Sequence, residues 1–461
     1  MPAIAPVLDR IDQDLDQSLA RLFDLVRIKS ISTDKAYAAD CRRAAEWLVA
    51  DLKTIGFEAS VRDTTGHPMV VAHHEGPAGA PHLLFYGHYD VQPVDPLELW
   101  SDDPFAPAVK ELEPGRKVIT GRGSSDDKGQ LMLFVEACRA WKSVHGSLPA
   151  RITLLFEGEE ESGSPSLKPF LEANARELKA DFAMVCDTGM WDRETPAIST
   201  GLRGLVGEEV TIHAADRDLH SGHFGGAAAN PIRVLAKVLG AIHDDSGKVT
   251  IPGFYDGVEE TPTQIKRAWE GLGMTAGKFL GEVGLSVPSG EKDRSILELL
   301  WARPTAEFNG ISGGYEGAGF KTVIAAKASA KVSFRLVHKQ DPDKIRAAFR
   351  AFVEARLPAD CKASFEKHGG SPAIQLAYDS PVITKARAAL TEEWGKPALP
   401  IAMGGSIPIV GDFQKLLGME SLLVGFGLED DRIHSPNEKY DLTSFHKGQR
   451  SWARILHALT N

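Results

Sequence analysis

The sequence predicts an α/β protein of two domains: a mixed sheet with helices on both faces, and an inserted α+β domain with a ferredoxin-like element order. Three observations predict it. Helix and strand periodicities alternate over residues 7–186. The order becomes β-α-β-β-α-β over residues 205–367, and α/β alternation returns after residue 380. The expected domains are 1–204 with 373–461, and 205–372 as the insertion.

Helical periodicity begins with apolar residues from Leu8 to Val26, and a second helix ends at Gly56, a typical C-cap. The helices expected in the main domain are 7–28, 38–55, 129–145, 166–177, 380–394 and 443–459. Apolar runs bounded by turn residues predict the strands 57–62, 68–73, 82–88, 118–121, 151–156, 181–186, 397–401 and 420–425. Residues 92–115 are a long loop whose Trp100 and Phe105 favour an ordered conformation.

The inserted domain begins with a strand whose residues alternate like those of a two-faced sheet. The elements expected in this domain are strands at 205–214, 305–311, 328–337 and 361–367, and helices at 230–245 and 341–356. Residues 220–226 read as a flexible loop, and 246–300 as irregular with scattered helical pieces.

Composition and charge narrow the functional classes. The chain of 461 residues is 43% hydrophobic and 25% charged, as is ordinary for a soluble enzyme. Its net charge of −11 argues against a nucleic-acid partner. No apolar run approaches the length of a membrane span, and no basic, apolar leader precedes residue 22. The four cysteines are widely separated, so we expect a cytoplasmic protein.

The expected strand 82–88 ends in two polar groups, His88 and Asp90. Residues two apart on a strand share one face, and the carboxyl ends of strands in open α/β sheets are where ligands bind. An Asp beside a His can fix the ring orientation that a metal-bound His needs. The alternative is a hydrogen-bonded histidine in an ordinary polar strand end.

Further acids and imidazoles follow other predicted strands or turns. They are Asp126 with Asp127, the run Glu159-Glu160-Glu161, Asp187, and His434 within the segment 430–438. Taken alone, the glutamate run is better explained as a solvated acidic loop. Several such groups at the strand ends of one sheet favour a metal site, and mixed carboxylate and imidazole ligands suit zinc, manganese or cobalt.

The motifs 87–93, 121–129, 157–164 and 433–438 occur in the order typical of one family. They resemble the di-metal aminoacylase and peptidase family that includes carnosinases, cytosolic nonspecific dipeptidase, carboxypeptidase G, acetylornithine deacetylase and succinyl-diaminopimelate desuccinylase. The resemblance extends from about residue 15 to residue 455. Shorter fragments, at 201–204, 218–222, 334–337 and 404–408, place the chain nearest the carnosinase and nonspecific dipeptidase branch.

The resemblance implies a site for two divalent metal ions, zinc first, with manganese or cobalt possible. One ion would be held by His88, Asp126 and Asp187, and the other by Asp126, Glu161 and His434. Asp90 would orient His88. Glu160 would be the general base that takes a proton from water and returns it to the leaving amine.

The glutamate run leaves one ambiguity, because it has three glutamates where the family typically shows two. The base and the ligand could therefore be shifted by one residue. Counting back from Ser162-Gly163 selects Glu160 and Glu161.

The resemblance also implies that the inserted domain is a lid and a dimerisation surface. His220 would reach the site of the partner subunit and stabilise the oxyanion. Arg335 would bind the free carboxylate of the substrate, although an arginine on a strand is often only a surface or ion-pair residue. Thr322 and Ser406 would add hydrogen bonds, with His368 nearby.

These observations predict a di-metal dipeptidase or small-peptide carboxypeptidase that acts as a homodimer. The alternative is an N-acyl-amino-acid deacylase with the same metal core, because both substrate classes present a carboxylate to Arg335. A third possibility is an inactive relative kept for binding or assembly. Competent residues at every expected ligand position argue against that possibility.

Overall fold

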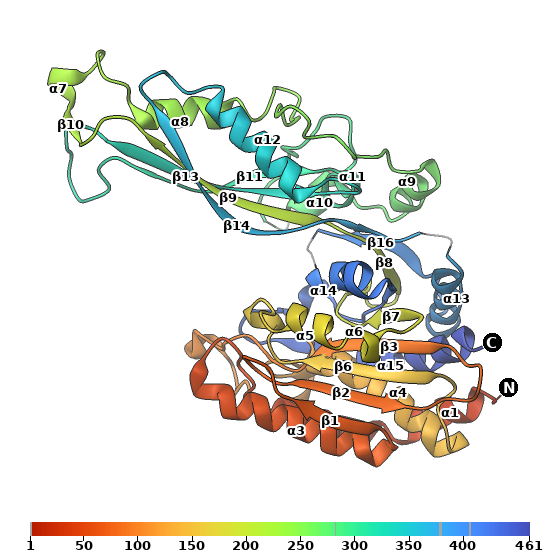
Figure 1. The fold of residues 1–461 in the computed structure, drawn as a ribbon. Coiled ribbons are helices and arrows are strands. Elements are labelled where there is room, and N and C mark those ends of the chain that lie inside the picture. The colour runs from red at the N-terminus through yellow and green to blue at the C-terminus, as the bar shows by residue number, and fades with distance from the viewer. Residues whose placement is uncertain (1, 282, 378–379, 405–406) are drawn as a thin grey trace. The chain divides into compact units, whose positions relative to one another are not determined.

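The computed structural model describes residues 2–281, 283–377, 380–404 and 407–461 (Figure 1). Two hydrophobic cores form among these residues. The first core lies in unit 1, which comprises Met1–Thr200, Leu376–Ile401 and Asp412–Asn461. The second lies in unit 2, which comprises Gly201–Gln375 and Ala402–Gly411. We describe each unit by itself.

A mixed sheet, whose strands belong mostly to unit 1 and whose last strand β15 belongs to unit 2, has the order β1-β2-β6-β3-β7-β17-β8-β15, and β16 also pairs with β8. Its strands are β1 (Glu58–Arg62), β2 (Met69–His74), β3 (His82–His88), β6 (Arg151–Glu157), β7 (Phe182–Val185), β8 (Ala197–Leu202), β15 (Ile374–Gln375), β16 (Leu399–Met403) and β17 (Glu420–Leu423). The central strands β6, β3, β7 and β17 are parallel, whereas β1, β2 and β8 pair antiparallel. The predicted mixed sheet is therefore confirmed.

Helices cover both faces of this sheet, as two adjacent residues of β3 show. Phe85 stacks on Phe134 of helix α4 (Lys128–His145), with ring centroids 4.0 Å apart, and meets Trp452 of helix α15 (Leu442–Leu459) edge-on. Tyr86 points the opposite way and contacts Phe413 in the π-helical turn Phe413–Leu417. Both faces of the strand are buried, which explains its nearly continuous apolar sequence. The helices of unit 1 are α1 (Ala5–Gln13), α2 (Leu15–Val26), α3 (Ala38–Ile55), α4 (Lys128–His145), α5 (Leu167–Ala173), α6 (Ala175–Leu178), α13 (Pro381–Trp394) and α15 (Leu442–Leu459), whereas α14 (Pro408–Asp412) belongs to unit 2 except for its last residue.

Three expectations for unit 1 were wrong in detail. The helix expected at 7–28 is broken at Asp14 into α1 and α2, and its apolar spacing continues through the break, so periodicity gave no sign of it. The helix expected at 166–177 is likewise divided into α5 and α6. The expected loop 92–115 contains the 3₁₀ turn Leu97–Leu99 and strand β4 (Ala108–Glu113). The expected C-cap Gly56 is confirmed, with φ of 97°.

A second, small sheet in unit 1 has the order β18-β5-β4, with β5 at Arg116–Thr120 and β18 at Lys439–Asp441. β18 pairs antiparallel with β5, so Lys439 lies opposite Thr120. The segment that precedes β18 therefore lies beside the segment that follows β5. Residues 434–438 and 121–126 are brought together in this way, although some 300 residues separate them in sequence.

Unit 2 contains a four-stranded antiparallel sheet in the order β11-β13-β9-β14, which confirms the ferredoxin-like expectation. Its strands are β9 (Gly204–His213), β11 (Thr305–Gly313), β13 (Lys327–Leu336) and β14 (Lys362–Ser371). Helices α8 (Pro231–Gly240) and α12 (Pro342–Glu354) pack against one face. Glu208 lies on that face, buried, and pairs with Arg346 and Arg350 of α12. The opposite face is polar and open.

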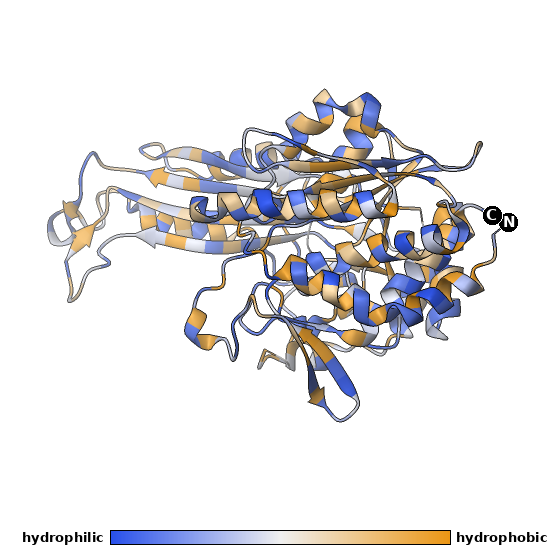
Figure 2. Cartoon of the chain, turned by 90° about the horizontal axis from the view of Figure 1, so that it is seen from below, coloured by the Kyte–Doolittle hydropathy of each residue, from blue (hydrophilic) through white to orange (hydrophobic). Residues whose placement is uncertain are grey.

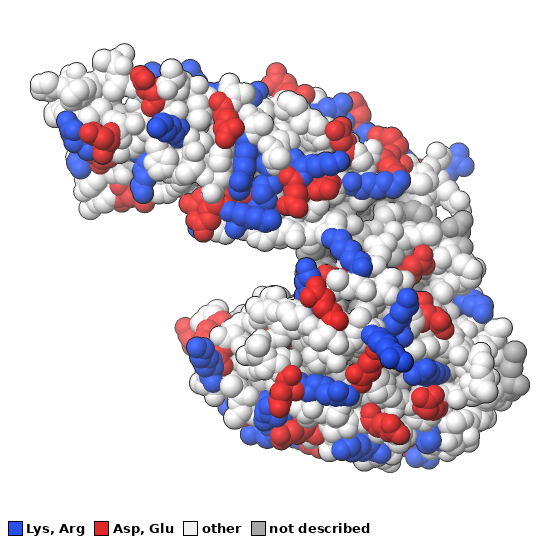
Figure 3. Space-filling model, in the orientation of Figure 1, with Lys and Arg blue, Asp and Glu red and all other residues white. Residues whose placement is uncertain are grey.

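The remaining elements of unit 2 are short: β10 (Leu219–His220), α7 (Ser221–Phe224), α9 (Thr263–Glu270), α10 (Ala276–Gly281), α11 (Ile296–Trp301) and β12 (Val323–Ile324). Helices of both units show hydrophobic and hydrophilic residues on different sides (Figure 2). On the face drawn in Figure 3, cationic and anionic side chains are interspersed. No helix in the described ranges is both long and apolar enough to span a bilayer.

Candidate metal centre

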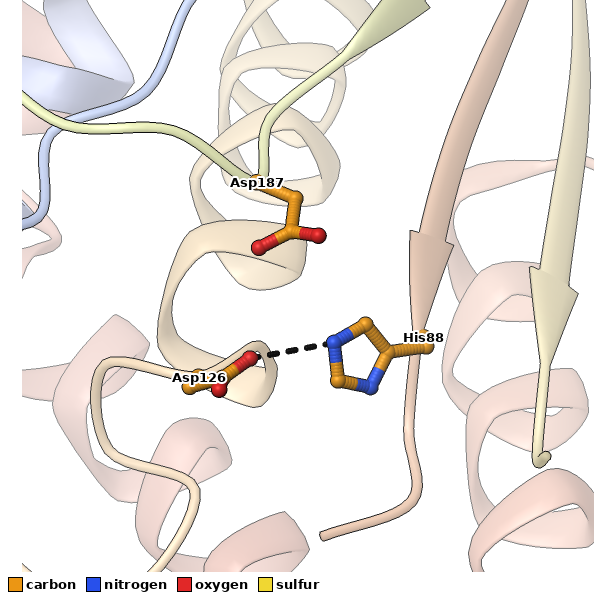
Figure 4. A group of neighbouring side chains, drawn as sticks. All are labelled: His88, Asp126 and Asp187. Atoms are coloured by element: carbon orange, nitrogen blue, oxygen red, sulfur yellow. Dashed lines mark hydrogen bonds and ion pairs between the residues drawn. The ribbon is translucent and has the colours of Figure 1, made fainter. Parts of the chain in front are cut away.

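Three side chains from different elements of unit 1 point toward one another in Figure 4. His88 ends β3, Asp187 follows β7, and Asp126 lies in the turn before α4. One ligand atom from each lies within 4.8 Å of the others. His88 Nε2 is 3.1 Å from Asp126 Oδ1. His88 and Asp187 meet because β3 and β7 are parallel neighbours whose carboxyl ends lie at the same sheet edge.

A second group shares Asp126 and adds Glu161 and His434. His434 Nε2 lies 3.0 Å from Asp126 Oδ2 and 3.1 Å from Glu161 Oε2. Glu161 comes from the 3₁₀ turn Glu160–Ser162 after β6, and His434 from the segment before β18. Asp126 thus offers one carboxylate oxygen to each group, which is the arrangement of a bridging ligand in a two-metal site.

Asp90 is fully buried and connects the end of β3 to the glutamate turn. Its Oδ1 lies 3.4 Å from His88 Nδ1, on the side of the ring away from Asp126. Its two carboxylate oxygens also accept hydrogen bonds from the backbone N–H groups of Glu160 and Glu161. One carboxylate therefore fixes both a histidine ring and the turn that presents two acids.

The three adjacent glutamates have different surroundings. Glu159 is buried and accepts hydrogen bonds from the backbone N–H groups of His67, at 2.9 Å, and Ser166, at 3.0 Å. Glu161 bonds His434 and accepts from Gln92 Nε2 at 2.7 Å. Glu160 accepts no hydrogen bond from any described residue. Glu159 is thus engaged in holding the backbone, and Glu160 is the free carboxylate of the run.

The site holds more carboxylates than positively charged side chains, and this imbalance affects their pKa values. Burial raises the pKa of Glu160 to about 7, and the neighbouring carboxylates of Asp126 and Glu161 raise it as well. Burial also raises the pKa of Asp187 well above its usual value, and Asp126 adds to the effect. Burial would raise the pKa of Asp126 too, but hydrogen bonds from His434 and His88 lower it.

The donor set fits divalent cations. Five side chains offer imidazole nitrogens and carboxylate oxygens, the ligands of zinc, manganese and cobalt: His88, Asp126, Glu161, Asp187 and His434. The largely buried carboxylate of Asp187 forms no hydrogen bond or ion pair with a described residue, and His88 opposes the rise in its pKa only in part. A buried carboxylate without such a partner is stabilised by a nearby cation, and a metal ion held by His88, Asp126 and Asp187 would supply that charge.

Glu438 is a functional candidate that sequence reasoning missed. Its buried carboxylate accepts hydrogen bonds from the backbone N–H groups of Gly123, Ser125 and Asp126, at 2.9–3.1 Å, and from Arg122 Nη1 at 2.8 Å. It therefore shapes the turn that presents Asp126. The sequence signal for Glu438 is its place at the end of the motif 433–438, which also contains the predicted ligand His434.

The remaining predicted site residues belong to the sequence ranges of unit 2. His220 is exposed at the end of β10, and its Nδ1 accepts from Gly222 N at 3.0 Å. Thr322 is close to it, because its carbonyl accepts from Ser221 N at 3.1 Å. Ser406 lies outside the described residues.

Arg335 and His368 lie on the open face of the four-stranded sheet, on β13 and β14, with β9 between them. The structure therefore does not bring them into direct contact. His368 instead forms an exposed acidic group with Glu209 and Glu366, and its Nε2 lies 3.7 Å from Glu209 Oε2.

Comparison with known proteins places this geometry in context. A profile of "Peptidase family M20/M25/M40" matches residues 84–458. The Cys-Gly metallodipeptidase dug1 of Schizosaccharomyces pombe is 31% identical over 468 residues, covering 98% of this chain and 97% of the relative. The Beta-Ala-His dipeptidase of Homo sapiens is 28% identical over 380 residues, covering 81% and 74%. The solved structure of the M20 family metallo-carboxypeptidase Sso-CP2 from Sulfolobus solfataricus superposes with a TM-score of 0.82, at 29% identity, over 96% of this chain and 99% of that one.

Proposed function

Because the chain belongs to the peptidase family M20/M25/M40, we propose that it is a metal-dependent dipeptidase that hydrolyses the amide bond of dipeptides or small peptides. The relatives named for Cys-Gly and β-Ala-His dipeptides support this substrate class. The observation that carries the proposal is the sharing of Asp126 between two groups of metal-competent side chains.

We propose that His88, Asp126 and Asp187 hold one divalent ion, and that Asp126, Glu161 and His434 hold a second. Zinc is the first candidate for both positions, with manganese or cobalt as alternatives, because nitrogen and carboxylate ligands suit all three. Such a metal pair, when bound, polarises the amide carbonyl and acidifies a water molecule.

Glu160 is the proposed general base. Its carboxylate is buried and accepts no hydrogen bond from a described residue, and burial raises its pKa to about 7, near the working pH of a general base. It takes a proton from the attacking water as the oxygen–carbon bond forms. It gives this proton to the amide nitrogen as the carbon–nitrogen bond breaks. Asp90 keeps His88 oriented throughout, through the contact with Nδ1.

Residues of unit 2 are proposed to bind the substrate. Arg335 binds its free carboxylate, with hydrogen bonds from Thr322 and Ser406 and with His368 nearby. A guanidinium suits a planar carboxylate because it can donate two parallel hydrogen bonds. His220 of the partner subunit stabilises the oxyanion.

Because His220 is proposed to act in the site of a partner subunit, we also propose that the protein is a homodimer whose subunits meet through unit 2. Four exposed apolar side chains in the segments that adjoin the paired strands β10 and β12 and at the end of β11 support it: Phe224, Ile311, Tyr315 and Phe320. Phe320 is 90% exposed and Ile311 is 65% exposed. β11 is also an edge strand of its sheet. Sedimentation velocity should show a dimer for the wild type and for Val287→Asp, an exposed control, and a monomer for Ile311→Asp combined with Phe320→Asp.

A cytoplasmic location is also proposed. All four cysteines are buried and free, which is typical of a reducing compartment. Cell fractionation of a tagged full chain would test it.

Hydrolysis of a substrate panel tests the proposed function. The panel contains Cys-Gly, β-Ala-His and N-acetyl amino acids, each with zinc or manganese and each with a chelator. Metal-dependent cleavage of the dipeptides is expected. Cleavage of the N-acetyl amino acids alone would favour the alternative deacylase, and cleavage of neither class would overturn the proposal.

A further inference from the structure

Arg203 and Arg335 lie next to each other in unit 2. β9 and β13 pair antiparallel, with Leu205 opposite Arg335. Arg203 precedes Leu205 by two residues, so it occupies the diagonal position from Arg335, within reach of long side chains. The residues of β13 on either side of Arg335, Phe334 and Leu336, are buried against the helices. Arg335 therefore points to the open face of the sheet.

The two guanidinium groups face an unfavourable electrostatic environment. Burial lowers the pKa of Arg203 to about 10, and the charge of Arg335 lowers it as well. Glu307 on β11 acts in the opposite direction, but it forms no ion pair with either arginine. Within the described ranges, no carboxylate pairs with Arg203 or Arg335. Two cations are thus held close together without an anion, an arrangement that an anionic ligand would stabilise.

Arg203 is also held in place by the chain segment 403–404. Its backbone N–H donates to the carbonyl of Met403 at 3.3 Å, and its Nε donates to the carbonyl of Gly404 at 3.1 Å. A Cβ atom on residue 404 would lie only 3.0 Å from Arg203 Nη2, so the glycine permits this close approach. The terminal nitrogens Nη1 and Nη2 form no hydrogen bond with a described residue and remain available to a ligand.

We propose that Arg203 is a second guanidinium of the carboxylate site and binds the free terminal carboxylate of the substrate together with Arg335. This inference rests on the proposed function only in taking Arg335 as a carboxylate-binding residue. A carboxylate has two oxygens in one plane, and two guanidiniums, one just before β9 and one on β13, can each donate to it. The pair makes the enzyme selective for substrates with a free carboxyl terminus.

Kinetics of a dipeptide and its C-terminal amide test the inference. We compare the wild type with Arg203→Met, Arg203→Lys and a control, Lys331→Met, which removes an exposed cation from the same face of β13. Arg203→Met should raise the KM of the dipeptide about 10-fold or more, change kcat less than about 3-fold, and leave the amide unaffected. Arg203→Lys should restore only part of the loss, and Lys331→Met should change nothing. Equal effects on dipeptide and amide, or no effect on either, would overturn the inference.

Calorimetric titration of metal-loaded protein with a free amino acid gives a readout that does not need turnover. The affinity for glycine or histidine should fall about 10-fold in Arg203→Met and stay unchanged in Lys331→Met. An unchanged affinity in Arg203→Met would contradict the assignment. An Arg203-dependent affinity in a protein without dipeptidase activity would instead mean that the proposed function is wrong and the carboxylate site is right.

Discussion

His88 Nε2 lies 3.1 Å from Asp126 Oδ1, while the other oxygen of the same carboxylate lies 3.0 Å from His434 Nε2. One aspartate thus joins two histidines that are 346 positions apart in the sequence. Each histidine belongs to a different group of metal-competent residues. The loss of this carboxylate should therefore affect both groups at once.

Asp126→Ala should reduce the bound metal from two ions to less than one per chain, because no carboxylate would remain between the two positions. Asp187→Ala should remove one ion and leave the other. Glu209→Ala, in the exposed acidic group of unit 2, is the control and should retain both. Inductively coupled plasma mass spectrometry after dialysis measures the counts. Two ions retained by Asp126→Ala would exclude a shared ligand.

Glu160→Gln should keep both metal ions and lower kcat about 10²–10⁴-fold, because it removes only the proton acceptor. Glu159→Gln is the matched control in the same run. It should retain turnover but lose about 1–3 kcal/mol of unfolding free energy, because the backbone N–H groups of His67 and Ser166 lose a charged acceptor. The reverse pattern would show that the base is shifted by one residue.

Glu438→Ala should weaken metal retention about 10–100-fold, because the turn that presents Asp126 loses its buried acceptor. The control is Glu393→Ala, which removes a buried acid that pairs with Arg450 and Arg454. Both variants should lower the midpoint of thermal unfolding, but only Glu438→Ala should release metal more readily to a competing chelator. Equal metal affinity in the two variants would leave Glu438 with a purely structural role.

His220→Ala should lower kcat about 10²–10³-fold with the fold intact, if His220 stabilises an oxyanion. A heterodimer of His220→Ala and Glu160→Gln subunits, isolated with two affinity tags, tests whether it acts in the partner's site. One of its two sites would then hold both an intact base and an intact histidine, so activity should return to about half of the wild-type value. A heterodimer as inactive as its parents would argue against action in trans.

Local sequence patterns predicted the elements that bury either a continuous apolar run or a periodic apolar face. The strand ending at His88 and the four strands of unit 2 are examples, and the mixed sheet and the ferredoxin-like order followed from them. The break at Asp14 was not predictable, because the apolar spacing is the same on both sides of it. Strand β18 is only three residues long, and its pairing with β5 is a long-range contact that no local pattern encodes.

In the candidate site, too, local motifs were predictable from the sequence, whereas long-range contacts were not. Motif residues predicted the two ligand groups that the structure brings together, although their roles stay predictions. Glu438 was missed because its partners are backbone N–H groups, which have no signature in the sequence. The sequence marks Arg203 only as part of the fragment 201–204. Its relation to Arg335 depends on the register of two strands whose closest ends, His213 and Lys327, are 114 positions apart in the sequence.

The most direct test is a metal titration of the metal-free protein, with dipeptide hydrolysis as the readout. The protein is stripped with a chelator, dialysed and titrated with zinc or manganese. Activity toward Cys-Gly or β-Ala-His should be absent without metal and should reach its plateau at two equivalents per chain. Full activity of the stripped protein, or no dipeptide cleavage at any metal content, would contradict the two-metal dipeptidase.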